Sequence, residues 1–112
     1  MTTEEEARIA RTESVFRYVN ERIAETADRF DADDAEFVCE CANAECHHRI
    51  EAQLEDYEEV RAEPTTFLVA DGHELPEHES VRQRRRGYMV VEKMTRGLRL
   101  AVRRTDPRAG PA

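Results

Sequence analysis

The sequence predicts an α+β fold in which a long N-terminal helix packs on a small, mainly antiparallel sheet. Residues 4–30 carry apolar side chains at helical spacing, and residues 36–92 contain several short runs rich in β-branched and aromatic residues. The length of 112 residues suits one domain. We therefore expect a single domain over residues 1–112, with a core over 35–105 and a frayed tail over 106–112.

The first expected element is the helix over residues 4–30. Thr3 is the expected N-cap, and the three glutamates that follow it suit the positive end of the helix dipole. Spacings of three, four and seven residues join the apolar stripe, which consists of Ile9, Phe16, Val19, Ile23, Ala27 and Phe30. Such a stripe can cover the rest of the domain or pair with a second copy of the chain. Because a small sheet needs a cover, we expect the first arrangement.

The remainder of the chain reads as short strands joined by turns. Strands are expected over residues 36–39, 49–52, 67–70 and 88–92. A short helix is expected over 54–62, where Pro64 ends it. Residues 73–86 are expected to form a loop with at most one helical turn, and residues 98–105 fit either a strand or a helix.

The N-terminus and the cysteine content predict a cytoplasmic location. No run approaches the roughly 18 apolar residues of a membrane span, and the acidic start lacks the basic and apolar parts of a secretory signal. In that reducing compartment thiols stay reduced, and three cysteines cannot all pair within one chain. With 6% aromatic residues and no Trp, the core is modest, and a metal crosslink is a common means of stabilising such a domain.

The spacing Cys39-x-Cys41-x4-Cys46 is the most specific feature of the sequence. Zinc takes four ligands in a tetrahedron, with Zn–S distances of about 2.3 Å. Alternate residues of a strand point to one face, so Cys39 and Cys41 can converge where the chain bends. Asn43 suits a turn that brings Cys46 back beneath them. The spacing therefore predicts a zinc-knuckle loop that binds one structural Zn²⁺.

The fourth ligand is expected to be one of the histidines, His47, His48, His73 or His78. His47 adjoins Cys46, so aiming both side chains at one ion would strain the turn. His73 follows a turn signal at the end of an expected strand, from which it could cross to the cysteine loop. His73 is therefore favoured, and His48 is the alternative.

The chain also resembles a family of short uncharacterised bacterial proteins. The resemblance spans roughly residues 11–107 and rests on Phe37-Val38-Cys39-Glu40-Cys41, Cys46, Tyr57-Glu58-Glu59-Val60-Arg61, Phe67, Val69, Gly72-His73-Glu74 and Val90-Val91-Glu92-Lys93. The family pattern is Phe-x-Cys-x-Cys-x4-Cys, then Glu-Tyr-x-x-Val-Arg and Pro-Gly-His-Glu, and Asp71 replaces its usual proline here. The resemblance implies that His73 is the fourth ligand, because His47 and His48 fall outside the pattern. It implies no particular activity.

Familiar catalytic motifs are missing from the sequence. His73 and Glu74 do not begin a zinc-hydrolase His-Glu-x-x-His motif, because His78 comes five residues later and Pro76 breaks a helix. The chain has neither a Gly-rich phosphate loop nor a Gly-x-Ser-x-Gly elbow. We expect no catalytic residues and a non-enzymatic, zinc-stabilised module for protein interaction or regulation, whose partner is another protein and not a membrane. The alternative is a thiol-based redox or zinc sensor.

Charge is unevenly distributed along the chain. The net charge of −8 combines −12 over residues 1–63 with +4 over residues 64–112. The basic residues of the second half include Arg82, Arg84, Arg85, Arg86, Arg96, Arg99, Arg103 and Arg104. Such a cluster could contact the phosphates of a nucleic acid. Because the net charge is negative and aromatic residues are few, we favour a solvated or internally paired patch.

Overall fold

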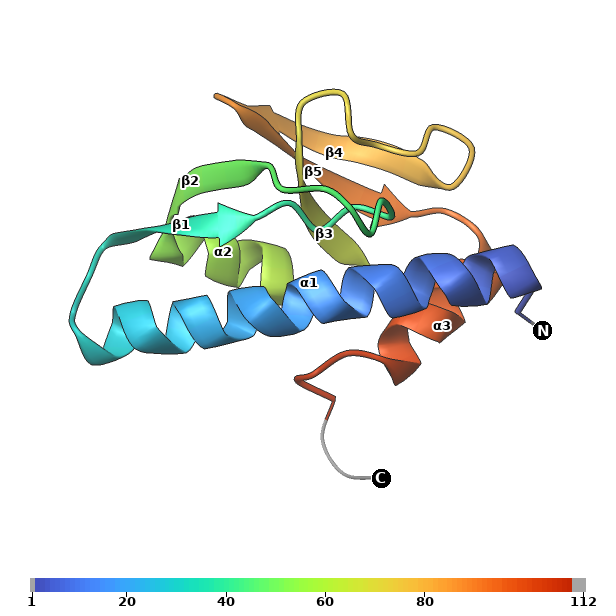
Figure 1. Ribbon diagram of the computed structural model, residues 1–112. Coiled ribbons are helices and arrows are strands. Elements are labelled where there is room, and N and C mark those ends of the chain that lie inside the picture. The colour runs from blue at the N-terminus through green and yellow to red at the C-terminus, as the bar shows by residue number, and fades with distance from the viewer. Residues whose placement is uncertain (1, 110–112) are drawn as a thin grey trace.

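The computed structural model describes residues 2–109 and confirms the α+β class (Figure 1). The elements in chain order are α1 (Glu4–Arg29), β1 (Asp34–Val38), β2 (Arg49–Gln53), α2 (Leu54–Arg61), β3 (Thr66–Ala70), β4 (Glu79–Arg85), β5 (Tyr88–Lys93) and α3 (Arg96–Arg104). Among the described residues, no helix combines the length and apolar character needed to cross a bilayer.

Two small antiparallel sheets replace the single sheet that the sequence predicts. β1 pairs with β2, and β5 lies between β3 and β4 in the second sheet. α1 runs along one side of both sheets, and α3 packs against it (Figure 1). The long helix therefore joins two sheets that have few contacts with each other.

β4 is the element that the sequence analysis missed. Its residues lie in the segment expected to be a loop, and most of its side chains are exposed. Because this edge strand is exposed along most of its length, its sequence shows little apolar alternation. The turn before β5 contains Gly87 at φ +85°, a backbone conformation that favours glycine. The ambiguous segment after β5 is the helix α3, which begins at the N-cap Thr95.

The face of α1 that packs into the core differs from the predicted apolar stripe. The Thr3 cap is present as a full capping box. Within the stripe Ile9 and Ala27 are buried, whereas Val19 and Phe30 are exposed. The buried face consists of Glu6, Ile9, Ala10, Glu13, Arg17, Asn20, Ala24 and Ala27. α1 therefore covers the domain as predicted, but mainly through polar and small side chains.

Lys93 of β5 compensates the buried charge of α1. Its Nζ lies 2.5 Å from Oε1 of Glu13 and also binds Glu79 of β4, and all three side chains are almost fully buried. Two cations lie over the ring of Phe67, with Arg17 Cζ 3.5 Å and Lys93 Nζ 4.3 Å from its centre. Charges at this depth persist only when they are paired. Ion pairs and cation–π contacts thus join α1 to the three-stranded sheet.

The C-terminal tail, which was expected to be frayed, begins with residues that contact the body of the domain. Arg61 of α2 binds Asp106, and Arg108 binds Glu21 of α1. These contacts cross from the tail to two helices, so the start of the tail differs from the prediction. The rest of that prediction, at residues 110–112, lies outside the described residues.

Candidate metal centre

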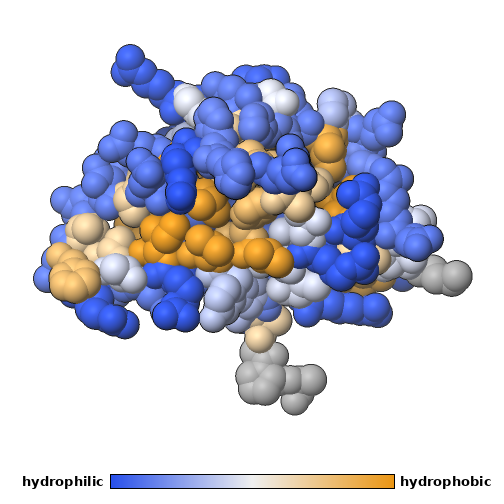
Figure 2. All heavy atoms as spheres, in the orientation of Figure 1, coloured by the Kyte–Doolittle hydropathy of each residue, from blue (hydrophilic) through white to orange (hydrophobic). Residues whose placement is uncertain are grey.

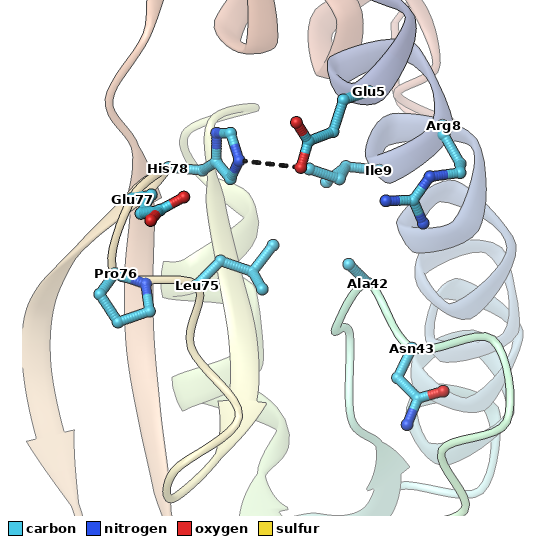
Figure 3. A pocket seen from close by; sticks show the side chains of 9 residues that line it. All are labelled: Glu5, Arg8, Ile9, Ala42, Asn43, Leu75, Pro76, Glu77 and His78. Atoms are coloured by element: carbon cyan, nitrogen blue, oxygen red, sulfur yellow. Dashed lines mark ion pairs between the residues drawn. The ribbon is translucent and has the colours of Figure 1, made fainter.

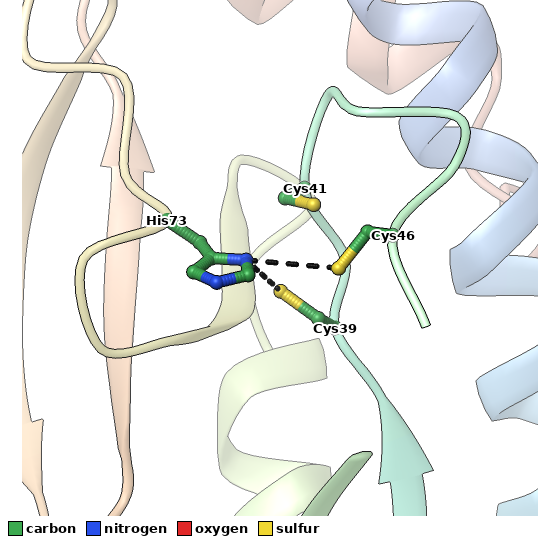
Figure 4. A group of neighbouring side chains, drawn as sticks. All are labelled: Cys39, Cys41, Cys46 and His73. Carbon is green, nitrogen blue, oxygen red and sulfur yellow. Dashed lines mark hydrogen bonds between the residues drawn. The ribbon is translucent and has the colours of Figure 1, made fainter. Parts of the chain in front are cut away.

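Four side chains from two loops, one after β1 and one after β3, meet at one place in the structure. Cys39 follows β1, Cys41 and Cys46 lie in the loop between β1 and β2, and His73 lies in the turn after β3 (Figure 4). One potential ligand atom from each of the four residues lies within 4.8 Å of the others. The structure thus brings together the four residues that the sequence analysis selected, and this group could hold a metal ion.

Backbone contacts fix the position of Cys39 and His73. The Nδ1 atom of His73 lies 3.6 Å from Sγ of Cys39 and 3.6 Å from Sγ of Cys46. The backbone N–H of Ala70, the last residue of β3, donates a hydrogen bond of 3.2 Å to Sγ of Cys39. Gly72, at φ +81°, reverses the chain after β3 and turns His73 towards the cysteines.

The other three histidines do not belong to this group. His47 and His48 are exposed, although the His48 ring lies 5.3 Å from that of His73, centre to centre. His78 lies before β4, where its Nε2 is 3.6 Å from Oε1 of Glu5. The geometry therefore favours His73 over His48 as the potential fourth ligand, because of these four histidines only His73 has a ring nitrogen close to the cysteine sulfurs.

The cysteines are free thiols with unequal surroundings. Cys39 and Cys41 are buried and Cys46 is half-buried. The pKa of Cys41 is lowered to about 4, chiefly because its thiolate accepts a hydrogen bond from Cys39. The pKa of Cys39 is raised because it donates that bond and is buried. A thiolate is the form that ligates metals, so the cysteines release protons when a cation binds.

Glu40 lies between the first two cysteines and connects the loop between β1 and β2, which we call the metal loop, to the core. Its side chain is fully buried, and Oε1 accepts the backbone N–H of Leu68 at 3.0 Å. Oε2 accepts from Asn20 of α1 at 2.9 Å and from the Tyr57 hydroxyl of α2 at 3.1 Å. The backbone N–H of Glu40 also donates to the carbonyl of Leu68 at 2.8 Å. One residue thus connects the metal loop to α1, α2 and β3.

The sequence analysis did not assign a role to Glu40, Asn20 or Tyr57. The available signal was an acidic residue between two cysteines that were themselves expected to be ligands. A carboxylate there either faces solvent or is buried with several donors, and the local sequence does not distinguish the two. The donors lie 20 residues before Glu40 and 17 and 28 residues after it.

Replacing Glu40 with Ala is expected to weaken metal retention and to destabilise the fold by about 2–4 kcal/mol. The change leaves the backbone N–H of Leu68 without this acceptor, and an uncompensated buried donor costs about 1–3 kcal/mol. Asn20 and Tyr57 each lose one of two partners, since they also contact Val38 and Glu21. Chelator competition and urea unfolding measure the two effects. Glu51→Ala on exposed β2 is the matched control. Equal metal retention by the two variants would show that Glu40 does not position the ligands.

A cavity of about 510 Å³ lies beside the metal loop (Figure 3). Its walls come from α1 (Glu5, Arg8 and Ile9), from the metal loop (Ala42 and Asn43) and from the turn before β4 (Leu75, Pro76, Glu77 and His78). None of the four potential metal ligands lines it. The cavity is therefore adjacent to the candidate metal centre without opening onto its ligand atoms.

Fold and site together define a small α+β domain with a Cys₃His group that could hold a metal ion. Comparison of the chain with protein-family models, with curated proteins and with solved structures gave no match. The resemblance to short bacterial proteins stays a prediction from the motif.

Proposed function

We propose that this chain is a zinc-stabilised, non-enzymatic domain that acts as a protein-interaction or regulatory module in the bacterial cytoplasm. The observation that carries the proposal is the convergence of three sulfurs and one imidazole nitrogen within 4.8 Å, from loops tied to the core. Three thiolates and one imidazole form a common structural zinc set. Thiolate ligands favour zinc over magnesium or calcium, which prefer oxygen.

Four protein ligands fill a tetrahedron and leave no position for a reactive water, which supports a structural and not a catalytic metal. Three thiolates also give the zinc site a net charge of −1, which makes it a poor Lewis acid. The acids near the centre offer little support for catalysis. Glu79 is held by Lys93 and accepts the backbone N–H of Leu75 at 2.7 Å, and Glu77 lines a cavity to which none of the four potential metal ligands contributes.

The arginine cluster favours a protein partner over a nucleic acid. Arg82 and Arg99 both pair with Glu92, and Arg85 lies 3.9 Å from Asp56. Arginines that are already paired with carboxylates of the same chain have less charge to offer to phosphates. Three of the eight arginines in the cluster are thus paired, which supports the solvated or internally paired patch that the sequence analysis favoured.

A thiol-based sensor is the second candidate, and the partial exposure of Cys46 and His73 supports it. Hydrogen peroxide can reach Cys46, where it would take two electrons from two zinc-bound thiolates and two protons from solvent. The products are one disulfide and two waters, and the zinc is released because two of its ligands have been oxidised. Zinc content and free thiols before and after mild peroxide separate a sensor from a purely structural site.

His73→Ala is expected to lower zinc retention against a chelator by at least about tenfold, whereas His48→Ala has little effect. Loss of His73 removes one of the four metal ligands. Mutating a residue that only hydrogen-bonds a metal ligand already lowers metal affinity by about tenfold or more, so loss of a direct ligand should cost at least as much. The same chelator titration on both variants makes the comparison. Preferential zinc loss from His48→Ala would assign the ligand role to His48.

X-ray absorption of the zinc-loaded protein tests the structural assignment directly. Three sulfurs, one nitrogen and no water support a structural zinc. A zinc-bound water would contradict the non-enzymatic proposal.

Affinity capture of partners by the zinc-loaded protein, with Cys46→Ser as the comparison, tests whether an interaction depends on the metal.

A further inference from the structure

An apolar surface runs along α1 outside the core, and we call it the α1 band. Its exposed members are Val15, Tyr18, Val19 and Phe30. Ile23 and Ala27 continue it towards β1, and Phe16 extends it towards Ala44. Figure 2 shows it as an orange region across the middle of the face that α1 occupies in Figure 1. From Val15 to Phe30 the helix rises about 22 Å.

The band exists because α1 buries a different face. Glu13, Arg17 and Asn20 occupy the core side, which leaves the apolar stripe at the edge of the interface. Phe30 is 74% exposed and Val19 is 38% exposed. Exposed apolar patches that are rimmed by polar residues mark interaction sites.

Part of the band forms an open groove of about 560 Å³ between α1 and β1. Its floor is almost wholly apolar, and its charged lining residues are Arg22 on α1 and Asp34 on β1. Neither side chain forms an ion pair with another described residue. Arg22 lies on the solvent side of the helix and Asp34 at the start of the strand, so the two edges of the groove carry opposite charges.

We propose that a second copy of this chain occupies the groove and forms a two-fold symmetric dimer. In such a dimer the same patch meets itself, so the patch must complement its own charges. A two-fold axis along the groove places Arg22 of one copy against Asp34 of the other, twice. Phe16, Val19, Ile23 and Phe30 have the 3-4-7 spacing with which one helix packs along another. The band thus offers apolar packing at the centre and matched charges at both edges.

The oligomeric state of the full zinc-loaded chain is the first measurement. Sedimentation across the micromolar range is expected to give a dimer, and Val19→Glu a monomer with unchanged zinc content. Val19 is already partly exposed, so the new charge is tolerated in a monomer. A wild-type chain that stays monomeric throughout this range would overturn the proposal while leaving the proposed zinc function untouched.

Charge reversal then tests the pairing of the two edges. Arg22→Asp and Asp34→Arg alone are each expected to weaken the dimer at least tenfold, because like charges then face each other. An equal mixture of the two variants is expected to recover a heterodimer of near wild-type affinity, as is the double variant alone. Arg29→Asp, on the same helix but outside the groove, is the control. Failure of the mixture to associate would rule out this arrangement.

Discussion

Removing the metal, or replacing Cys41 with Ser, is expected to unfold the whole domain. Structural zinc in small domains contributes roughly 10–16 kcal/mol of apparent binding free energy, whereas domains of this size are stable by only about 5–15 kcal/mol. The four potential ligands lie in two loops, one within the β1–β2 hairpin and one after β3. Cys41 also adjoins Glu40, which contacts α1, α2 and β3. Disorder is therefore expected to begin at residues 36–52 and to spread beyond them.

Circular dichroism with elemental analysis checks this expectation. The purified wild-type chain should carry about one zinc, and a chelator should abolish its cooperative thermal transition. His47→Ala, next to Cys46 but outside the ligand group, is the control and should behave as wild type. A chelated protein that melts at the wild-type temperature would show that the site does not stabilise the fold.

Lys93→Met is expected to destabilise the domain by about 3–5 kcal/mol, because it leaves the buried carboxyl groups of Glu13 and Glu79 without their cation. Glu13 and Glu79 would then face each other in the core. Adding Glu13→Gln and Glu79→Gln to Lys93→Met should recover much of the loss. Arg82→Met removes the exposed pair with Glu92 and should cost less than about 1 kcal/mol. Urea unfolding of the wild type, Lys93→Met, the triple variant and Arg82→Met measures these losses of stability. Equal losses from Lys93→Met and Arg82→Met would contradict the prediction.

The same buried group predicts how stability depends on pH. Burial, together with the charge of Glu79, raises the pKa of Glu13 from 4.5 to about 8, although Lys93 opposes the shift. Between pH 4.5 and about pH 8 the carboxyl group of Glu13 keeps its proton in the folded state, whereas the same group has lost its proton in the unfolded state. The stabilisation is therefore complete below pH 4.5 and declines as pH rises to about 8, by at most about 1.4 kcal/mol per pH unit. Glu13→Gln should flatten this decline.

Local sequence patterns carried much of the fold and most of the candidate metal centre. The capping box at Thr3 and the long helical stretch predicted α1, and short β-rich runs predicted four of the five strands. Cysteine spacing and a turn signal selected Cys39, Cys41, Cys46 and His73, which the structure brings together. The helix cap, the strands and the cysteine spacing were predictable because each depends on residues within a few positions of one another. His73 lies 34 residues after Cys39 and was selected by its own turn signal.

Only the tertiary structure decided which face of α1 is buried and how the metal loop is held. The apolar stripe of α1 predicted burial of Val19 and Phe30, yet the helix buries Glu13 instead. Lys93, 80 residues further along the chain, makes that burial stable. β4 was missed because an edge strand acquires its hydrogen bonds from β5 and needs no apolar alternation of its own. A buried charge is stable only beside its counter-charge, and the fold alone determines which distant residues become neighbours.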